Sequence, residues 1–519
     1  MATDDTPIFK TVKDISGGVN NRQQGSIISD GQVTVLTNVD IGVLGESKKR
    51  PGLTLVEDLG DDVGTGIFGF MPVGGTDLLI ATHNQKLETY PGSSTFTERK
   101  TDFTAGTVTT MLKAGEEGEG DVLLVYVKGN NWFRFTEENL AGTGSPDDLG
   151  NTTGTSDSPP DSGVATLYRQ RFWILKNNLL YWSTIFPTDF STAFNTVANA
   201  YQVDVGTERA LISIREQGII VMGSDAIYGV NPGQETDSTP AATDKVEKLL
   251  DIGCVAGKTA AQVGDDVLFL APDGVRALFR SQQDKLQSGK SFPLSYNLKT
   301  QYDDINWAQI SKATAVYFDN KYFLSIPTGS SITNNQVWVY YPATEAWMII
   351  DGWSVADFAK IIFSGKEVLY AIDSDDGTVY KAWDGYSDNS VAITYTEEGK
   401  KEDFEKPLFT KSGGEVRIKA LASGDYDLDI YIELDDGGYQ VLGTMNLSGG
   451  APALPQSLPF NLGAVNIKEQ VFHLDEYGPY RQIRLKIEQT TTNGSDDITI
   501  YERTIVTYGD EYQSESTIS

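Results

Sequence analysis

The segment KYFLSIPTGSSITNNQVWVYYPATEAWMIIDGW, residues 321–353, decides the fold. It begins with a run in which Tyr322, Leu324 and Ile326 alternate with the residues between them. A polar, turn-rich gap follows, and then come VWVYY, a Pro-Ala-Thr-Glu turn and WMII. Short runs of β-branched and aromatic residues between turn residues are typical of antiparallel strands. The segment therefore predicts three strands in succession.

The same outline recurs along the chain, so we interpret the segment as most of one copy of a structural repeat. Each copy reads as a strand, a tight turn, an apolar strand, a Gly/Asp/Asn turn and an aromatic strand. The copies begin at Ile67, Val108, Val164, Ala210, Thr259, Ala313 and Ala359. A spacing of roughly 46 residues falls in the range of propeller blades. We predict an all-β chain with a β-propeller of six to eight blades, seven favoured, in which Trp338 and Trp347 pack in the core.

We divide the chain into an N-terminal extended arm (1–60), the β-propeller (61–388) and a C-terminal antiparallel β-sandwich (389–519). Two-residue periodicity in segments such as YDLDIYIEL and DITIYERTIVTY predicts the sandwich. The arm is polar and Gly-rich and shows no core face of its own. One helix is predicted, over Thr243–Ile252, with Asp244 as its N-cap.

Composition narrows the classes of function. The chain has 519 residues and a net charge of −31, from 72 acidic and 41 basic residues. This balance disfavours tight binding to DNA or to anionic membranes, and it suits a channel along which a polyanion slides. No apolar run is long enough to span a membrane, and the N-terminus shows no signal segment, so we expect folding in the cytoplasm and no membrane insertion. With one cysteine and two histidines, a disulfide, a catalytic triad or a His-rich metal site is not expected.

Three motifs resemble ligand sites, and we interpret each as structural. GTGIFG at Gly64–Gly69 is followed by a hairpin instead of the helix that a dinucleotide site needs. GCVAGKT at Gly253–Thr259 is one residue short of a P-loop and also precedes a strand. SDDGTVY at Ser374–Tyr380 resembles a sialidase Asp-box but lacks a spacer residue on either side of Gly377, so a plain hairpin turn is expected. No cofactor is predicted.

The stretch GDYDLDIYIELDDGG carries the most regular charge pattern. Asp425, Asp427, Asp429 and Glu433 fall on one face of a predicted strand, together with Tyr431, and apolar residues fall on the other face. This acidic face is interpreted as the solvated side of a sandwich strand, as part of an acidic channel wall, or as a calcium site.

Basic and amide side chains gather at two places in the arm, in VNNR and in ESKKRPG. Such clusters are commonly solvated, but on an acidic protein they can also dock on a neighbouring subunit. We therefore expect the arm to serve assembly. The residues concerned are Asn20, Asn21, Arg22, Lys48, Lys49 and Arg50.

Three stretches in this order resemble β-propeller tail proteins of short-tailed bacteriophages, known as nozzle, tubular tail or packaged-DNA stabilisation proteins. They begin GGVNNRQQG (from Gly17), LYRQRFWIL (from Leu167) and IGCVAGKTA (from Ile252), and the closing segment from Gly478 is similar as well. The resemblance implies a non-enzymatic virion protein at the distal end of the tail, forming a homohexameric ring that retains packaged DNA and conducts it into the host. It also implies tail adaptor proteins and tail fibres or spikes as partners, and transient, non-specific contact with phage DNA.

Two other classes remain open from the sequence. One is a phage glycan-binding or depolymerase propeller, which would bring aromatic and carboxylate side chains together on one face of the propeller. Carboxylates are abundant, but no glycosidase pair stands out. The other is a receptor-binding or decoration protein, attached singly or in threes.

Overall fold

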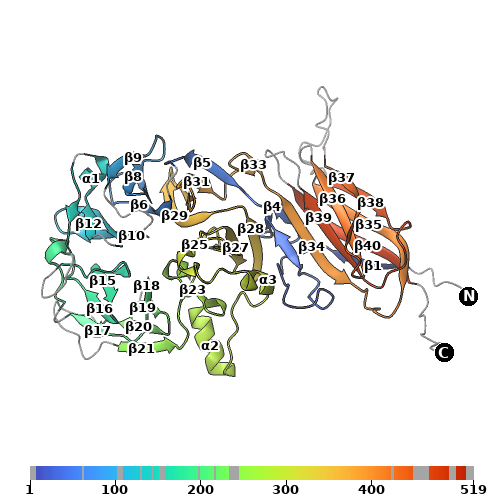
Figure 1. Cartoon of the computed structure of the whole chain (residues 1–519), viewed down its shortest axis with the longest axis horizontal. Coiled ribbons are helices and arrows are strands. Elements are labelled where there is room, and N and C mark those ends of the chain that lie inside the picture. The colour runs from blue at the N-terminus through green and yellow to red at the C-terminus, as the bar shows by residue number, and fades with distance from the viewer. Residues whose placement is uncertain are drawn as a thin grey trace, which may run out of the picture.

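The computed structural model of the chain has a ring of small sheets at one end and a two-sheet sandwich at the other (Figure 1). The structure describes residues 7–60, 63–101, 109–128, 131–142, 144–150, 158–196, 199–214, 218–232, 245–421, 426–447, 467–489 and 498–509.

The first four blades of the ring are each a four-stranded antiparallel sheet made from one continuous part of the chain. Their strands are, in blade 1, β6 (Gly64–Phe70), β7 (Leu78–His83), β8 (Lys86–Tyr90) and β9 (Thr97–Lys100); in blade 2, β10 (Thr109–Glu116), β11 (Gly120–Val127), β12 (Trp132–Phe135) and β13 (Asp147–Asp148); in blade 3, β14 (Ala165–Tyr168), β15 (Arg171–Lys176), β16 (Leu179–Trp182) and β17 (Ala200–Gln202); and in blade 4, β18 (Glu208–Ile214), β19 (Gly218–Gly223), β20 (Ile227–Asn231) and β21 (Lys245–Leu250). Short helical turns α1 (Glu137–Ala141) and η1 (Phe190–Thr192) lie in their loops.

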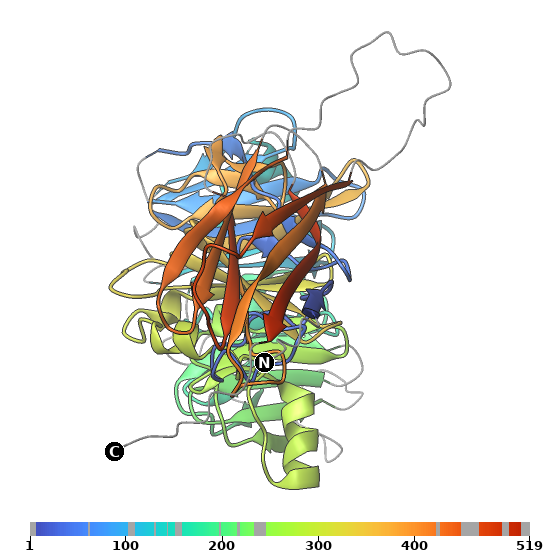
Figure 2. The same cartoon turned by 90° about the vertical axis from the view of Figure 1, so that its right-hand side faces the viewer.

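Blade 5 has three strands, and a helical insertion follows it. The elements are η2 (Gly257–Thr259), β22 (Ala261–Val263), β23 (Asp266–Ala271), β24 (Gly274–Ala277), α2 (Leu278–Ser288), α3 (Lys299–Asp303) and η3 (Ile310–Lys312). The outer edge of β24 is covered by the segment after α2, because Leu294 donates its backbone N–H to the Val275 carbonyl. Helix α2 projects from the rim of the ring (Figures 1 and 2).

Blade 6 comes from the segment that opened the sequence analysis. Its strands are β25 (Thr314–Phe318), β26 (Lys321–Ile326), β27 (Gln336–Tyr341) and β28 (Ala346–Asp351). The turn between β25 and β26 is Asp319-Asn320, with φ of 47° and 55°, which are the left-handed values that a two-residue type I′ hairpin needs. Trp338 and Trp347 are 0% and 1% exposed, which confirms that they pack in the core.

Blade 7 closes the ring with a strand from the arm. Strands β29 (Val355–Phe363), β30 (Lys366–Asp373) and β31 (Val379–Ala382) are completed by β5 (Leu53–Glu57), which pairs antiparallel with β31. The innermost strand β29 contacts β6 of blade 1. The last blade is thus tied to the residues that precede the first, and the prediction of a β-propeller with seven blades favoured is confirmed.

A second arm strand joins the propeller to the sandwich. Strand β2 (Val35–Thr37) lies between β28 of blade 6, with which it is parallel, and β34 (Tyr395–Glu402), with which it is antiparallel. The sheet continues through β39 (Ile483–Gln489), β36 (Asp427–Leu434) and β37 (Tyr439–Asn446). One nine-stranded sheet therefore runs from blade 6 to the far edge of the sandwich.

The other sheet of the sandwich also contains arm strands, and Figure 2 shows the sandwich facing the viewer. Its strands are β3 (Val39–Asp40), β4 (Ser47–Lys49), β40 (Thr499–Gly509), β35 (Lys411–Leu421) and β38 (Ile467–His473), with β1 (Pro7–Val12) beside β40. A separate short pair of strands, β32 (Ser387–Asp388) and β33 (Val391–Ala392), extends the sheet of blade 7. The two sheets face each other across buried side chains such as Ile418 and Ile430. The predicted sandwich is confirmed.

Two details of the predicted fold are wrong. The described part of Thr243–Ile252 contains strand β21 and no helix, and Asp244 lies outside the described residues. The helix-like pattern of apolar residues in this segment is short. Pairing of the segment with the open edge of β20 therefore decides its structure. The arm was expected to lack a core face, yet Val19, Leu36 and Val39 are buried in the core that propeller and sandwich share.

Candidate functional site

A cavity of about 690 Å³ lies in the middle of the ring. Its wall is made by the beginnings of the inner strands and by the segments that lead into them. Apolar side chains and charged groups alternate around it. The charged and aromatic lining residues include Phe68, Lys128, Glu208, Arg209, Lys258, Asp357 and Phe358.

Lys258 of the P-loop-like segment lies in this wall. Its Nζ is 2.6 Å from Asp357 Oδ2 and 3.3 Å from the Thr65 carbonyl. The hydroxyl of Thr314 donates to the other oxygen of Asp357 at 3.0 Å. The segment forms the 3₁₀ turn η2 and then strand β22, as its sequence context indicated, and the lysine connects blade 5 to blade 7.

Arg209, on the innermost strand of blade 4, was not singled out in the sequence. Its Nε is buried and has no hydrogen-bond partner, and no ion pair of this side chain exists among the described residues. The adjacent Glu208 accepts the backbone N–H of Asn178 at 2.8 Å. Glu208 and Arg209 are therefore neighbours on one strand that differ in their contacts. Glu208 is hydrogen-bonded within the fold, whereas Arg209 faces the cavity region without an ion pair among the described residues.

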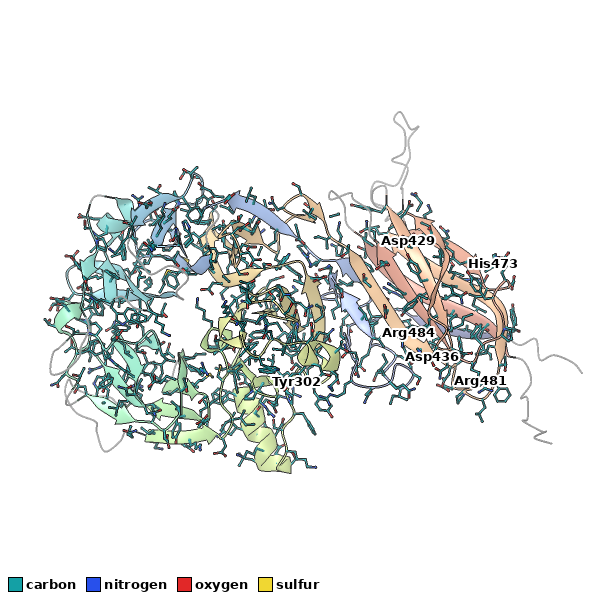
Figure 3. The ribbon with its side chains drawn as sticks, in the orientation of Figure 1. Tyr302, Asp429, Asp436, His473, Arg481 and Arg484 are labelled. Carbon is teal, nitrogen blue, oxygen red and sulfur yellow. The ribbon has the colours of Figure 1, made fainter. Side chains whose placement is uncertain are left out.

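The acidic face lies in the sandwich, away from this cavity (Figure 3). The alternation is as predicted, since Leu428, Ile430 and Ile432 are fully buried. Asp427 accepts from Asn446 Nδ2 at 2.7 Å, and Asp429 accepts from Thr444 Oγ1 at 3.0 Å.

Basic side chains flank the same face. Glu433 lies 3.5 Å from both Lys401 and Arg484, and Lys486 lies over the ring of Tyr431. Asp425 lies outside the described residues. Among the residues that the structure describes, no group of three or more His, Cys, Asp or Glu side chains could hold a metal ion.

The predicted assembly residues make contacts within their own chain. Asn20 donates to Gln32 at 2.9 Å, Asn21 donates to Gln301 at 2.7 Å, and Arg22 donates to the Tyr296 carbonyl at 2.5 Å. The amide and arginine groups of VNNR thus hold the arm on itself and on the insertion after blade 5.

The second basic cluster is more deeply enclosed. Lys48 and Lys49 belong to β4, and Lys49 is 3% exposed with its Nζ over the ring of Tyr426. Arg50 makes a two-pronged pair with Asp388, with distances of 2.6 and 2.9 Å.

The remaining N–H groups of Arg50 are also used. They reach Asn38 Oδ1 at 2.8 Å and the carbonyls of Pro51 and Asp351 at 3.0 and 3.3 Å. The guanidinium lies over the ring of Trp353, 4.8 Å from its centroid. All five donors of Arg50 have acceptors, so in the single chain this residue connects the arm to blades 6 and 7 and offers nothing to a neighbouring subunit.

The hairpin in SDDGTVY is a plain turn, as predicted. Asp373, just before it, accepts the backbone N–H of Asp375 at 2.7 Å, and Gly377 has a φ of 71°. Burial, together with the charges of Asp376 and Asp375, raises the pKa of Asp373 to about 6.

The Cys254 thiol and the His83 imidazole are enclosed as well. Burial raises the pKa of the Cys254 thiol to about 11, and its Sγ lies 3.1 Å from the Ala256 carbonyl. His83 is 2% exposed and lies 3.1 Å from Glu88, whereas His473 lies on β38 of the sandwich (Figure 3).

No protein-family model matches the chain, and a search of curated proteins found no match. Solved structures share the propeller fold at low similarity. PorZ of Porphyromonas gingivalis, a surface component of the type-IX secretion system, is 13% identical with a TM-score of 0.36; the match covers 70% of this chain and 44% of PorZ, so the chain spans less than half the length of that protein.

Two further propeller structures are similar at the same level. BBS1N, solved in complex with ARL6DN, is 12% identical with a TM-score of 0.37, covering 66% of this chain and 99% of that one. YCF48 from Cyanidioschyzon merolae is 10% identical with a TM-score of 0.36, covering 64% and 98%. These similarities concern the fold alone. No helix in the described ranges is long and apolar enough to cross a membrane.

Proposed function

We propose that the chain is a structural subunit of a short phage tail, the nozzle, which assembles as a ring, retains packaged DNA and gives it a passage during ejection. The observation that carries the proposal is the nine-stranded sheet from blade 6 through β2 into the sandwich. Because one sheet spans both parts, the subunit is a stiff, elongated block suited to the wall of a tube. Closed rings built from such blocks satisfy head-to-tail contacts without open polymers.

The insertion after blade 5 supports contacts between copies. Leu286 at the end of α2 is 82% exposed, and Phe292 is 63% exposed beside the ring of Tyr296. Exposed apolar groups on a projecting element are typical of protein contact surfaces. We propose that this insertion meets a neighbouring copy in the ring, with tail adaptor proteins and fibres or spikes as further partners.

The charge balance supports passage of DNA. Six copies would carry about −186 formal charges, six times −31, and each basic contact to phosphate would add salt-dependent affinity that slows the DNA. The acidic face of β36 remains our candidate for part of a pore wall between copies. A non-enzymatic role is favoured because Glu208 and Asp357 are both engaged by hydrogen bonds or an ion pair within the fold.

The test is to image the purified chain by electron microscopy and to measure its mass by light scattering, alone and with tail particles that lack the nozzle. A pore-bearing ring of about 340 kDa, six times 56.6 kDa, or stoichiometric addition to the particles, is the expected result. A monomer that adds to no such particle contradicts the proposal. Release of reducing sugar from host polysaccharide, abolished by a single carboxylate substitution, would favour the depolymerase instead.

A further inference from the structure

Arg209 is half-buried, and its hydrogen bonding differs from that of Arg50, the buried arginine that joins the arm to the propeller. Arg50 satisfies all five of its donors within the fold. Arg209 has a buried Nε without an acceptor and no ion pair among the described residues. Because a buried donor without a partner destabilises a fold, the buried Nε of Arg209 at the wall of a cavity is a place where an acceptor from outside the chain would add stability.

The backbone around Arg209 is fixed by close packing. A Cβ at Gly257 would lie 1.9 Å from the Arg209 carbonyl oxygen, so only glycine lets η2 approach β18 this closely. Lys258 follows Gly257 directly. The approach therefore sets two cationic residues from neighbouring blades in one region of the wall.

The carboxylates of the wall do not neutralise Arg209. Glu208 accepts the backbone N–H of Asn178. Asp357 is occupied by Lys258 and Thr314. The described charged lining residues are three cations, with Lys128 the third, against two acids. In a chain of net charge −31, the described lining residues of this cavity carry the opposite sign of charge.

The size and the apolar part of the wall indicate the kind of molecule. About 690 Å³ lies within the range of small-molecule sites, roughly 300–1,000 Å³. Phe68 and Phe358 contribute apolar surface. By contrast, the cavity beside Arg503, whose Nε and Nη1 also lack partners, measures about 40 Å³, room for little more than a water molecule.

We propose that the propeller cavity binds a small organic anion, with its carboxylate or phosphate oxygens on the Arg209 guanidinium and its apolar body against Phe68 and Phe358. A planar guanidinium binds such oxyanions through two parallel hydrogen bonds. The site belongs to the single chain and does not depend on ring formation.

The test is thermal unfolding of the full chain with four probes at constant ionic strength: acetate, benzoate, inorganic phosphate and phenyl phosphate. The expected result is a rise in Tm that grows with the logarithm of probe concentration, larger for benzoate than for acetate and for phenyl phosphate than for inorganic phosphate. If benzoate gives the larger rise in Tm, the site prefers a carboxylate. If phenyl phosphate gives the larger rise, it prefers a phosphate. No shift with any probe up to tens of millimolar contradicts the proposal.

Variants separate binding from a structural role. R209M keeps an unbranched apolar side chain but removes the unpaired charge, so it should abolish the shift and raise Tm without added anion. R209K should retain a shift at about tenfold higher concentration. R280Q, which alters an exposed arginine paired with Glu345 at 2.7 Å, should behave as the wild type. A lower Tm for R209M in anion-free buffer, or an undiminished shift, would show that Arg209 serves the fold and not a ligand.

Discussion

Blades 1 to 4 and blades 6 and 7 are built in two different ways. Each of the first four is a complete four-stranded sheet from one continuous segment. Blade 7 takes its outer strand from β5 of the arm, and the sheet of blade 6 continues through β2 of the arm into the sandwich. The first group depends on local hairpins alone, whereas the second adds pairing between residues more than 300 positions apart. Stability should therefore be concentrated in a few arm contacts.

Removing the arm should have the largest effect. Deletion of residues 1–57 takes away β1 to β5, opens the ring and exposes the core that propeller and sandwich share. Because arm side chains such as Leu36 and Val39 are buried in that core, we expect an insoluble chain or one without cooperative unfolding. The control inserts four Gly/Ser residues between Gly118 and Glu119, in an exposed turn of blade 2, where Tm should change little. A soluble, cooperatively unfolding truncated chain would show that the two groups of blades are equally self-sufficient.

Arg50→Met should have the next largest effect. It breaks an enclosed pair with Asp388 and removes the donors to Asn38 and to the Asp351 carbonyl, although Asn38 Oδ1 keeps the backbone N–H of Asp351. The expected loss is about 3–5 kcal/mol in the free energy of unfolding, measured by urea denaturation. Lys113→Met, in blade 2, removes a more exposed pair with Asp121 at 3.1 Å and should cost about 0–1 kcal/mol. Equal losses would contradict the comparison.

Asp373→Asn should stabilise the hairpin of blade 7 in a pH-dependent way. With a pKa of about 6, the folded carboxyl still holds a proton between pH 4 and 6 that the unfolded chain has released. Stability therefore falls as pH rises through that window, and the loss persists above pH 6. Asparagine keeps an oxygen for the N–H of Asp375, so the variant should gain about 1–2 kcal/mol at pH 7.5, allowing for partial exposure.

The same variant should gain only about a third as much at pH 4.5, because most of the window between the unfolded and the folded pKa lies above that pH. Thermal unfolding at both pH values measures the difference. Asp265→Asn, in an exposed turn of blade 5, is the control. A gain for Asp373→Asn that does not depend on pH would mean that its carboxyl is not held protonated.

The smallest effect on stability is expected at the acidic face. The variant replaces both acids with asparagine, Asp427→Asn together with Asp429→Asn. Lysine at these two positions would be repelled by Lys401 and Arg484, so it would test the face less cleanly. Asparagine still accepts from Asn446 and Thr444, so unfolding should shift by no more than about 0.5 kcal/mol. If the face lines a pore, DNA release from assembled particles should slow at low salt. Unchanged release at low salt would identify it as ordinary solvated surface, and Asp436→Asn in the exposed turn after β36 is the control.

The repeat was predictable because blades are local. The Asp319-Asn320 turn and the alternating strands around it decide blade 6 within about forty residues. The arm strands were not predictable, because β2 is the three residues VLT and its partners lie in β28 and β34. Nothing local to Val35–Thr37 distinguishes a strand from a loop, and the same holds for the buried role of Arg50.

The candidate site was predictable only in part. The sequence context correctly argued against a P-loop at Gly253–Thr259, but it could not place Lys258 beside Asp357, since blade 5 meets blade 7 only across the ring. Arg209 left one usable signal, a charged residue in the run ERALISI just before the apolar stretch of an inner strand. The cavity itself follows from the closure of seven sheets and has no signature in any one of them.

Closure of blade 7 by β5 also sets a delay during synthesis. Strand β5 leaves the ribosome about 320 residues before β31, its partner, is made. At roughly 5–20 residues per second, β5 waits about 15–65 s with an open edge. Strand β1 waits longer still, because its partner β40 is among the last residues to be translated. Polysomes that make this chain therefore expose arm strands of many nascent chains at once, and slower translation or chaperone capture over this interval should decide the yield of folded chains.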